Sequence, residues 1–305
     1  MRIVFMGTPD FSVPALEEIA KHHEVVAVVT QKDKPKGRGQ EMAFTPVKES
    51  ALKLNIPVLQ PEKVKDEEFV ETLRELNPDA IVVIAFGQIL SKEILDLPKY
   101  GCINVHASLL PKYRGAAPIQ WAVIDGEEKS GVCTMKMDEG LDTGDIIDCE
   151  EIALDPKETG GSLFDKLAVL GGELILKTLD KLEFGNAHFT KQNDDESTYA
   201  KKMTKDLGEI NFTESAASNE RLIRGLNPWP SAFTHLDGKV LKIWDADVVD
   251  GKGEPGEVIS EDKDSFVVAT GDGALKINEL QLEGKKRMKT SDFLNGRSIK
   301  GSKLG

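Results

Sequence analysis

Asp79-Ala-Ile-Val-Val-Ile-Ala-Phe86 carries an unbroken apolar run that stops at Gly87. Such a run is typical of a strand that is buried on both faces of a sheet. Cys102-Ile-Asn-Val-His106 is a second strand of this kind, and Ser91 is expected to begin a short helix between the two. Strands that alternate with helices predict a doubly wound, mostly parallel sheet.

The same alternation extends on both sides of this stretch. Further strands are expected at 3–6, 25–30, 57–59, 131–137 and 146–152, and helices at 45–54, 66–76, 117–124 and 162–182, with another helix starting near Ser12. The last helix contains Gly171-Gly172, a pair that is unfavourable inside a helix. The first 189 residues are therefore expected to form one α/β domain.

The pattern changes after about residue 188. Residues 190–206 are polar and charged and are expected to form a linker. Residues 207–305 contain short segments rich in Val, Ile and Leu, at 239–249, 257–260, 265–270 and 274–282, and they predict a smaller β-barrel domain. In the last segment the apolar positions shift phase between Ile277 and Leu280, which indicates a β-bulge.

The composition excludes several classes of protein. The formal net charge of -13 over 305 residues argues against a general nucleic-acid binder, although seven of the eight charged residues among the last 21 are basic. No signal peptide or membrane span is recognisable, so a cytoplasmic location is expected. The three cysteines stand apart, and we expect them to be reduced and to bind no zinc.

Asn104, His106 and Asp142 are the candidate catalytic groups. An amide and an imidazole can hold a developing oxyanion, and an imidazole and a carboxylate can move protons, so the set suits acyl transfer. Neither a Ser nor a Cys nucleophile is evident beside them, which favours direct transfer between two substrates. Taken singly, the Asn could be a turn residue, the His a core residue and the Asp part of a hydrogen-bonded loop.

Two other segments bear on function. Gly7-Thr8-Pro9 follows the first strand in place of the glycine-rich turn of dinucleotide-binding folds, which disfavours a nicotinamide-dependent oxidoreductase. The segment from Gln31 to Gln40 is longer than a usual connection, and it carries Lys32, Lys34, Lys36 and Arg38. Its composition alone favours a solvated, mobile loop.

The sequence resembles the folate-dependent formyltransferases. The residues that carry the resemblance are Asn104-Val-His106-Ala-Ser-Leu-Leu-Pro111, Met137-Asp-Glu-Gly-Leu-Asp-Thr-Gly-Asp145 and the opening Ile3-Val-Phe-Met-Gly-Thr-Pro9. In the C-terminal part, Thr198-Tyr-Ala-Lys-Lys202 and Asn227-Pro-Trp-Pro-Ser-Ala-Phe233 are similar to the members that act on initiator methionyl-tRNA. The resemblance implies a Rossmann-like catalytic domain followed by an OB-like barrel.

The resemblance also implies substrates and roles. The donor would be 10-formyltetrahydrofolate and the acceptor the α-amine of initiator methionyl-tRNA, without a metal, in a protein expected to be monomeric. Asn104 and His106 would stabilise the oxyanion, and Asp142 would assist His106 in proton transfer. Folate would lie against Ser108, Leu109, Leu110, Pro111, Phe86, Gln88, Ile89 and Leu90. The tRNA would contact Lys32, Lys34, Lys36 and Arg38, with Arg38 as the main contact.

Two alternatives remain open beside this interpretation. A formyltransferase acting on an amino-sugar nucleotide or another small amine would share the three catalytic groups and the Ser-Leu-Leu-Pro turn. It would not need the basic insert together with the second domain. A tRNA-binding protein that had lost its activity would not need an intact set of Asn104, His106 and Asp142.

Overall fold

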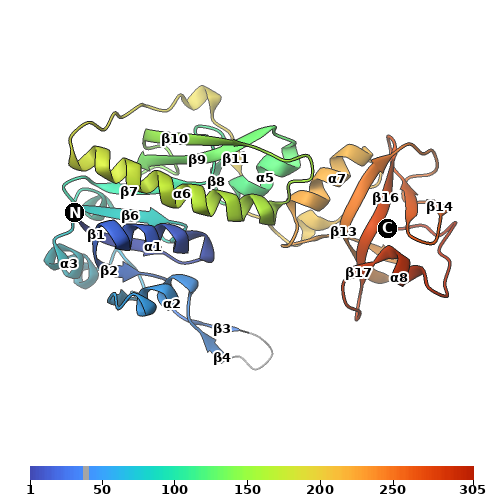
Figure 1. The fold of residues 1–305 in the computed structure, drawn as a ribbon, viewed down its shortest axis with the longest axis horizontal. Coiled ribbons are helices and arrows are strands. Elements are labelled where there is room, and N and C mark those ends of the chain that lie inside the picture. Colours follow the sequence, from blue (N-terminus) through green and yellow to red (C-terminus); the bar gives the residue numbers. More distant parts are fainter. Residues whose placement is uncertain (37–40) are drawn as a thin grey trace. The chain divides into compact units, whose positions relative to one another are not determined.

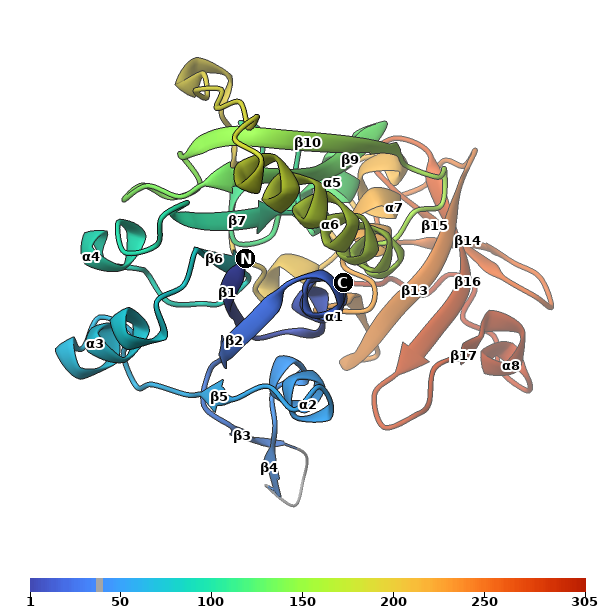
Figure 2. The ribbon, with the colours of Figure 1, turned by 60° about the vertical axis from the view of Figure 1, so that its left-hand side comes forward.

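The computed structural model describes residues 1–36 and 41–305, and its first compact unit is built on a seven-stranded sheet (Figure 1). The strand order is β10-β9-β7-β6-β1-β2-β5, which can be followed in Figure 2. Neighbours from β7 to β5 are parallel, and β9 is antiparallel to β7. The bounds are β1 Arg2–Gly7, β2 Glu24–Val29, β5 Val58–Leu59, β6 Ala80–Ile84, β7 Cys102–His106, β9 Lys129–Lys136 and β10 Asp145–Ala153. The predicted doubly wound, mostly parallel sheet is confirmed.

Helices cover both faces of the sheet because its central strands are apolar on both sides. Helices α1 (Val13–His22) and α6 (Gly160–Glu183) lie along one face in Figure 1. Helices α3 (Glu67–Leu76) and α4 (Lys92–Leu95) pack on the other face, in one core cluster with apolar side chains of β1 and β6. Val105 lies under α6, so alternation along β7 turns Asn104 and His106 away from that helix.

Helix α6 runs unbroken through Gly171-Gly172, which confirms the long helix predicted at 162–182. A Cβ atom on Gly171 would lie 3.1 Å from Cγ1 of Val105. A Cβ atom on Gly172 would lie 3.3 Å from backbone atoms of Pro14 and Ala15. The glycines thus allow α6 to approach β7 and α1 closely, and this packing offsets their low helix propensity.

The basic insert forms a hairpin where the sequence favoured a loop. Strand β3 (Lys34–Lys36) pairs antiparallel with β4 (Glu41–Ala43), and α2 (Pro46–Lys53) follows. At the base of the hairpin the ammonium of Lys48 donates to Asp33 Oδ2 at 2.6 Å and to Gln60 Oε1 at 2.8 Å. These largely buried contacts attach the hairpin to the edge of the sheet.

The second compact unit contains an antiparallel sheet in the order β12-β13-β16-β15-β14, with β17 beside β16. The bounds are β12 Ala232–Leu236, β13 Lys239–Val249, β14 Val258–Glu261, β15 Phe266–Ala269, β16 Ala274–Leu282 and β17 Met288–Lys289, with helices α7 Ala216–Gly225 and α8 Thr290–Leu294. The register between β13 and β16 shifts near Asp245, opposite Glu279. This confirms the predicted β domain and its bulge.

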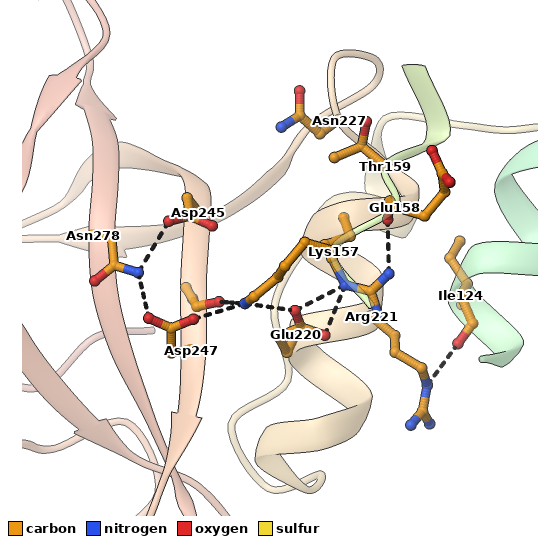
Figure 3. A network of polar contacts seen from close by, with 12 residues as sticks. Ile124, Lys157, Glu158, Thr159, Glu220, Arg221, Asn227, Asp245, Asp247 and Asn278 are labelled. Atoms are coloured by element: carbon orange, nitrogen blue, oxygen red, sulfur yellow. Dashed lines mark hydrogen bonds and ion pairs between the residues drawn. The ribbon is translucent and has the colours of Figure 1, made fainter. Parts of the chain in front are cut away.

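The second unit also takes in residues 116–129, with helix α5 (Pro118–Asp125), and residues 153–163. A polar network joins the latter segment to α7 and β13 (Figure 3). Lys157 pairs with Glu220 at 3.2 Å and with Asp247 at 2.7 Å, and Asn278 also donates to Asp247 at 2.8 Å. Burial opposes the charge of Lys157, but its hydrogen bonds to Asp247 and Glu220 outweigh burial and raise the pKa of Lys157.

The cysteines correct one expectation. Cys133 on β9 and Cys149 on β10 form a disulfide, whereas Cys102 is a buried free thiol. The two bonded residues become neighbours only because β10 lies beside β9 in the sheet, and their separation of 16 residues does not reveal this pairing. Among the described residues, no helix is long and apolar enough to cross a membrane.

Candidate functional site

The three candidate catalytic groups lie together at the carboxyl end of β7. Asn104 and His106 are two residues apart on this strand and therefore share a face of the sheet. Asp142 belongs to the loop between β9 and β10, and its Oδ2 lies 3.7 Å from Nδ1 of His106. The His106 and Asp142 side chains are 8% and 14% exposed, so this pair is shielded from most of the solvent.

The ring of His106 is oriented by a backbone carbonyl. Its Nε2 lies 2.9 Å from the carbonyl oxygen of Tyr113. A carbonyl can only accept, so Nε2 carries a hydrogen and donates it. Nδ1 faces Asp142 at a distance too long for a direct hydrogen bond. Nδ1 is thus the nitrogen that is available to exchange a proton.

Asp142 is held in an uncommon backbone conformation. Its φ angle is 53°, in the left-handed region that non-glycine residues rarely adopt. The backbone N–H of Gly115 donates to Oδ2 of Asp142 at 2.8 Å. The same oxygen atom therefore faces both the Gly115 amide and His106.

Asn104 has unused hydrogen-bonding capacity. Its Nδ2 donates to the carbonyl of Val83 on β6 at 3.0 Å, which leaves one amide hydrogen. Its Oδ1 is buried and has no hydrogen-bond partner among the described residues. Because an unpaired buried oxygen costs free energy, this atom is suited to accept from a bound molecule.

A largely apolar cleft is lined in part by Asp142. Its other lining residues are Gln88, Ile89 and Leu90 before β7 and residues 135, 137–141, 143 and 144 on β9 and in the loop after it. Ile89 is 89% exposed and Leu141 58% exposed, so two large apolar side chains of the lining face the solvent. Gln88 is fixed through its Oε1, which accepts from the Val64 amide at 3.0 Å.

The remaining residues predicted for folate are not part of that lining. Phe86 is buried in the core cluster beneath α3 and α4. The hydroxyl of Ser108 donates to the Lys112 carbonyl at 2.6 Å and closes the turn. Leu109 packs against Gly131, and Leu110 packs with Cys133 and Met135. Ser108–Pro111 thus forms a packed turn after β7.

The predicted tRNA contacts fall on the β3–β4 hairpin and the chain before it. Lys32 forms an ion pair with Glu62. Lys34 is exposed on β3, and the backbone of Lys36 ends that strand. Arg38 lies outside the described residues. Over residues 1–36 and 41–305, no group of three or more His, Cys, Asp or Glu side chains is arranged to hold a metal ion.

Sequence reasoning missed two parts of this site. The cleft is lined by every residue from Met137 to Gly144, although only Asp142 in this segment is assigned a role from the sequence. The stretch expected to be a linker returns to the site, where β11 (Tyr199–Ala200) pairs with β8 (Arg114–Gly115) and Gln192 contacts the loop of Asp142. The charged composition around Gln192 gives no signal for this contact.

The chain matches the family model described as Formyl transferase over residues 1–179 and that described as Formyl transferase, C-terminal domain, over 202–298. It is 59% identical to the methionyl-tRNA formyltransferase of Lachnospira eligens over 314 aligned residues, which span all of both chains. It is 52% identical to the methionyl-tRNA formyltransferase of Clostridioides difficile, with 98% of each chain covered.

Solved structures share the fold at lower identity. One is the sugar 3N-formyl transferase WlaRD, solved in the presence of dTDP and 5-N-formyl-THF, with a TM-score of 0.68 and 22% identity over 94% of this chain and 99% of that chain. Another is HypX from Aquifex aeolicus in complex with tetrahydrofolic acid, with a TM-score of 0.65, 20% identity and coverage of 99% and 48%. From the family models and the full-length relatives, the chain belongs to the formyl transferase family, and within it to the methionyl-tRNA formyltransferases.

Proposed function

We propose that this protein transfers the formyl group of 10-formyltetrahydrofolate to the α-amine of initiator methionyl-tRNA, giving N-formylmethionyl-tRNA. The observation that carries the proposal is the convergence of Asn104, His106 and Asp142 beside an apolar cleft. The full-length relatives, whose printed names specify methionyl-tRNA as the acceptor, support the choice of substrate.

Asn104 is proposed to stabilise the oxyanion that forms on the formyl oxygen. Its free amide hydrogen supplies the donor, and its unpaired Oδ1 can accept from the incoming amine. One donor of this kind contributes about 3–4 kcal/mol to the transition state. The bond to Val83 fixes the amide before substrates bind, so little reorganisation is needed during the reaction.

His106 and Asp142 are proposed to move the protons. Nε2 of His106 is committed to the Tyr113 carbonyl, so proton exchange runs through Nδ1 on the side of Asp142. The carboxylate stabilises the imidazolium form when the ring takes a proton from the amine. His106 can then pass this proton to the folate nitrogen as it leaves, so one imidazole serves as both base and acid.

The cleft residues fit a folate as the formyl donor. Ile89, Leu90 and Leu141 offer apolar surface for a flat ring system. The formyl group that the folate supplies is the only part transferred. Phe86 and the Ser108–Pro111 turn are proposed to support the cleft through packing, because their side chains face the core or the turn itself.

The basic insert is proposed to bind tRNA. Lys32, Lys34 and Lys36 lie in or just before the hairpin, and Arg38 follows in the sequence. The anchored hairpin base supports a role in presenting these cations to phosphates.

Arg38→Ala is expected to raise the KM for methionyl-tRNA and to leave folate affinity unchanged, measured by initial rates at limiting tRNA. Equal rates for variant and parent at limiting tRNA would contradict this role.

We also propose that the protein works in the cytoplasm, because charged tRNA is used there, and that it is a monomer.

The direct test is a formylation assay. The purified protein is mixed with 10-formyltetrahydrofolate and charged initiator methionyl-tRNA, and formyl-methionine is measured after the ester is hydrolysed. His106→Ala should nearly abolish the product while tRNA binding is retained. Absence of product with the parent protein, together with turnover on an amino-sugar nucleotide, would overturn the assignment of the acceptor.

A further inference from the structure

The loop that carries Asp142 needs support from outside itself. Asp142 has a left-handed φ angle of 53°, and the neighbouring Leu141 is 58% exposed. Within the loop, Asp138 accepts from the Gly140 amide at 3.0 Å and from the Thr143 hydroxyl at 2.6 Å. These bonds join Asp138 to Gly140 and to Thr143, but Asp142 itself takes no part in them. A strained residue persists only where its surroundings over-determine it, so other contacts must fix Asp142.

Gln192 supplies two such contacts. Its Nε2 donates to the backbone carbonyls of Asp142 and Gly144, each at 2.8 Å. Its Oε1 accepts from Nε and Nη2 of Arg114 at 3.1 Å and 2.9 Å. A guanidinium has only donors, so the Gln192 oxygen must face Arg114 and its amide hydrogens must face the loop. Every hydrogen-bonding site of this amide is therefore used in one orientation.

The same segment also supports His106. The Tyr113 amide donates to the Thr198 hydroxyl at 2.8 Å, and the Arg114 amide donates to the Thr198 carbonyl at 2.9 Å. These bonds fix the stretch whose Tyr113 carbonyl accepts from His106 and whose Gly115 amide donates to Asp142. Gln192 and Thr198 thus connect the supports of both members of the proton-transfer pair.

We propose that Gln192 is a positioning residue for the reaction, which acts by holding the Asp142 carboxylate against His106. This inference rests on the proposed function, in which Asp142 is catalytic. A carboxylate at position 192 could still pair with Arg114 but would oppose two carbonyl oxygens, so the residue must be an amide. Misplacing a catalytic group by about 1 Å can reduce the rate about 100-fold.

The test compares Gln192→Glu with the parent at saturating concentrations of both substrates. We expect kcat to fall about 100-fold, with little change in the KM for tRNA and in the melting temperature. Asp194→Asn is the matched control, because Asp194 accepts from the same Arg114 at 2.8 Å but is 80% exposed and does not contact the loop. This variant should keep the parental kcat. Gln192→Met, which removes both donated bonds without adding a charge, should lower kcat as Gln192→Glu does, and it serves as the test if Gln192→Glu fails to fold.

A double-mutant cycle separates positioning from a general structural role. In the Asp142→Asn background, Gln192→Glu should lose most of its effect, because the group that it positions is already disabled. An undiminished effect in that background, or a parental kcat for both Gln192 variants, overturns the inference. Parental activity of Asp142→Asn itself would instead overturn the catalytic assignment, so the two failures are distinguishable.

Discussion

Replacing Asp142 by Asn removes one charge while keeping the shape of the side chain. Oδ2 of Asp142 accepts from the Gly115 amide, so an Asn must also place its oxygen there, and that oxygen still faces Nδ1 of His106. The variant therefore preserves the geometry and leaves His106 opposite a neutral oxygen. It isolates the electrostatic contribution of the carboxylate.

The magnitude follows from the 3.7 Å separation of the two groups. At an effective dielectric constant of about 20, two unit charges at this distance attract by about 4 kcal/mol, and the 14% exposure of the carboxylate reduces this value. A loss of roughly 2–4 kcal/mol in the transition state lowers kcat by roughly 30- to 1,000-fold. Folate binding should change little, because the loop backbone is unaltered.

Single-turnover formylation with both substrates saturating measures this effect directly. Asp145→Asn is the control, since it makes the same change in charge at the start of β10, where the side chain is not part of the cleft. If Asp142→Asn formylated its substrate as fast as Asp145→Asn does, the electrostatic argument would be refuted. A loss of folate binding that matched the loss of rate would refute the assumption that the geometry is preserved.

Three further predictions concern stability and reactivity. Gly172→Leu forces a side chain against the backbone of Pro14 and should lower the free energy of unfolding by about 1–3 kcal/mol, measured by urea denaturation; an unchanged midpoint would contradict the close approach of α6 to α1. Lys157→Met should lower the free energy of unfolding by about 0.5–1 kcal/mol at neutral pH. The effect is small because the side chain of Lys157 is 53% exposed and solvent partly screens its ion pair with Asp247. The pKa of Lys157 is raised from 10.5, and that of Asp247 is lowered from 3.8, chiefly through its hydrogen bond from Lys157. The difference in the free energy of unfolding between parent and variant should therefore be constant between these two pH values and shrink as the pH rises above 10.5 or falls below 3.8. A difference that varies between pH 3.8 and 10.5 would exclude this pair as its source. Burial raises the pKa of the Cys102 thiol to about 12, so iodoacetamide at neutral pH should label it only after unfolding, as read by mass spectrometry, and labelling of the folded protein would contradict this.

The sequence predicts most of the sheet because its strands are long apolar runs. The run at Ala80–Ile84 and that at Cys102–His106 define neighbouring parallel strands, and Asn104 and His106 follow from the second. The bulge in β16 is visible as a shift in the phase of its apolar residues. Local patterns are sufficient here because burial on both faces requires them.

The parts that could not be predicted depend on contacts between distant segments. The Cys133–Cys149 disulfide requires that β10 lie beside β9, and Gln192 reaches Asp142 only after the chain has returned to the site. The close approach of α6 to β7 and α1 depends on what faces Gly171 and Gly172, which the helix sequence alone does not contain. The position of Phe86 also depends on distant segments, because an apolar side chain fits both the wall of a ligand site and the core that Phe86 occupies.

The division of the chain into two units has a consequence for synthesis on the ribosome. The first unit is made of residues 1–115, 130–152 and 164–200, and the segments between them belong to the second unit. Helix α5 packs against α7, which is translated much later, and the apolar residues between them include Ala117 and Leu226. The N-terminal half therefore leaves the ribosome exit tunnel with apolar surface that its own residues do not cover. We expect this stretch to be a place where chaperones engage the nascent chain.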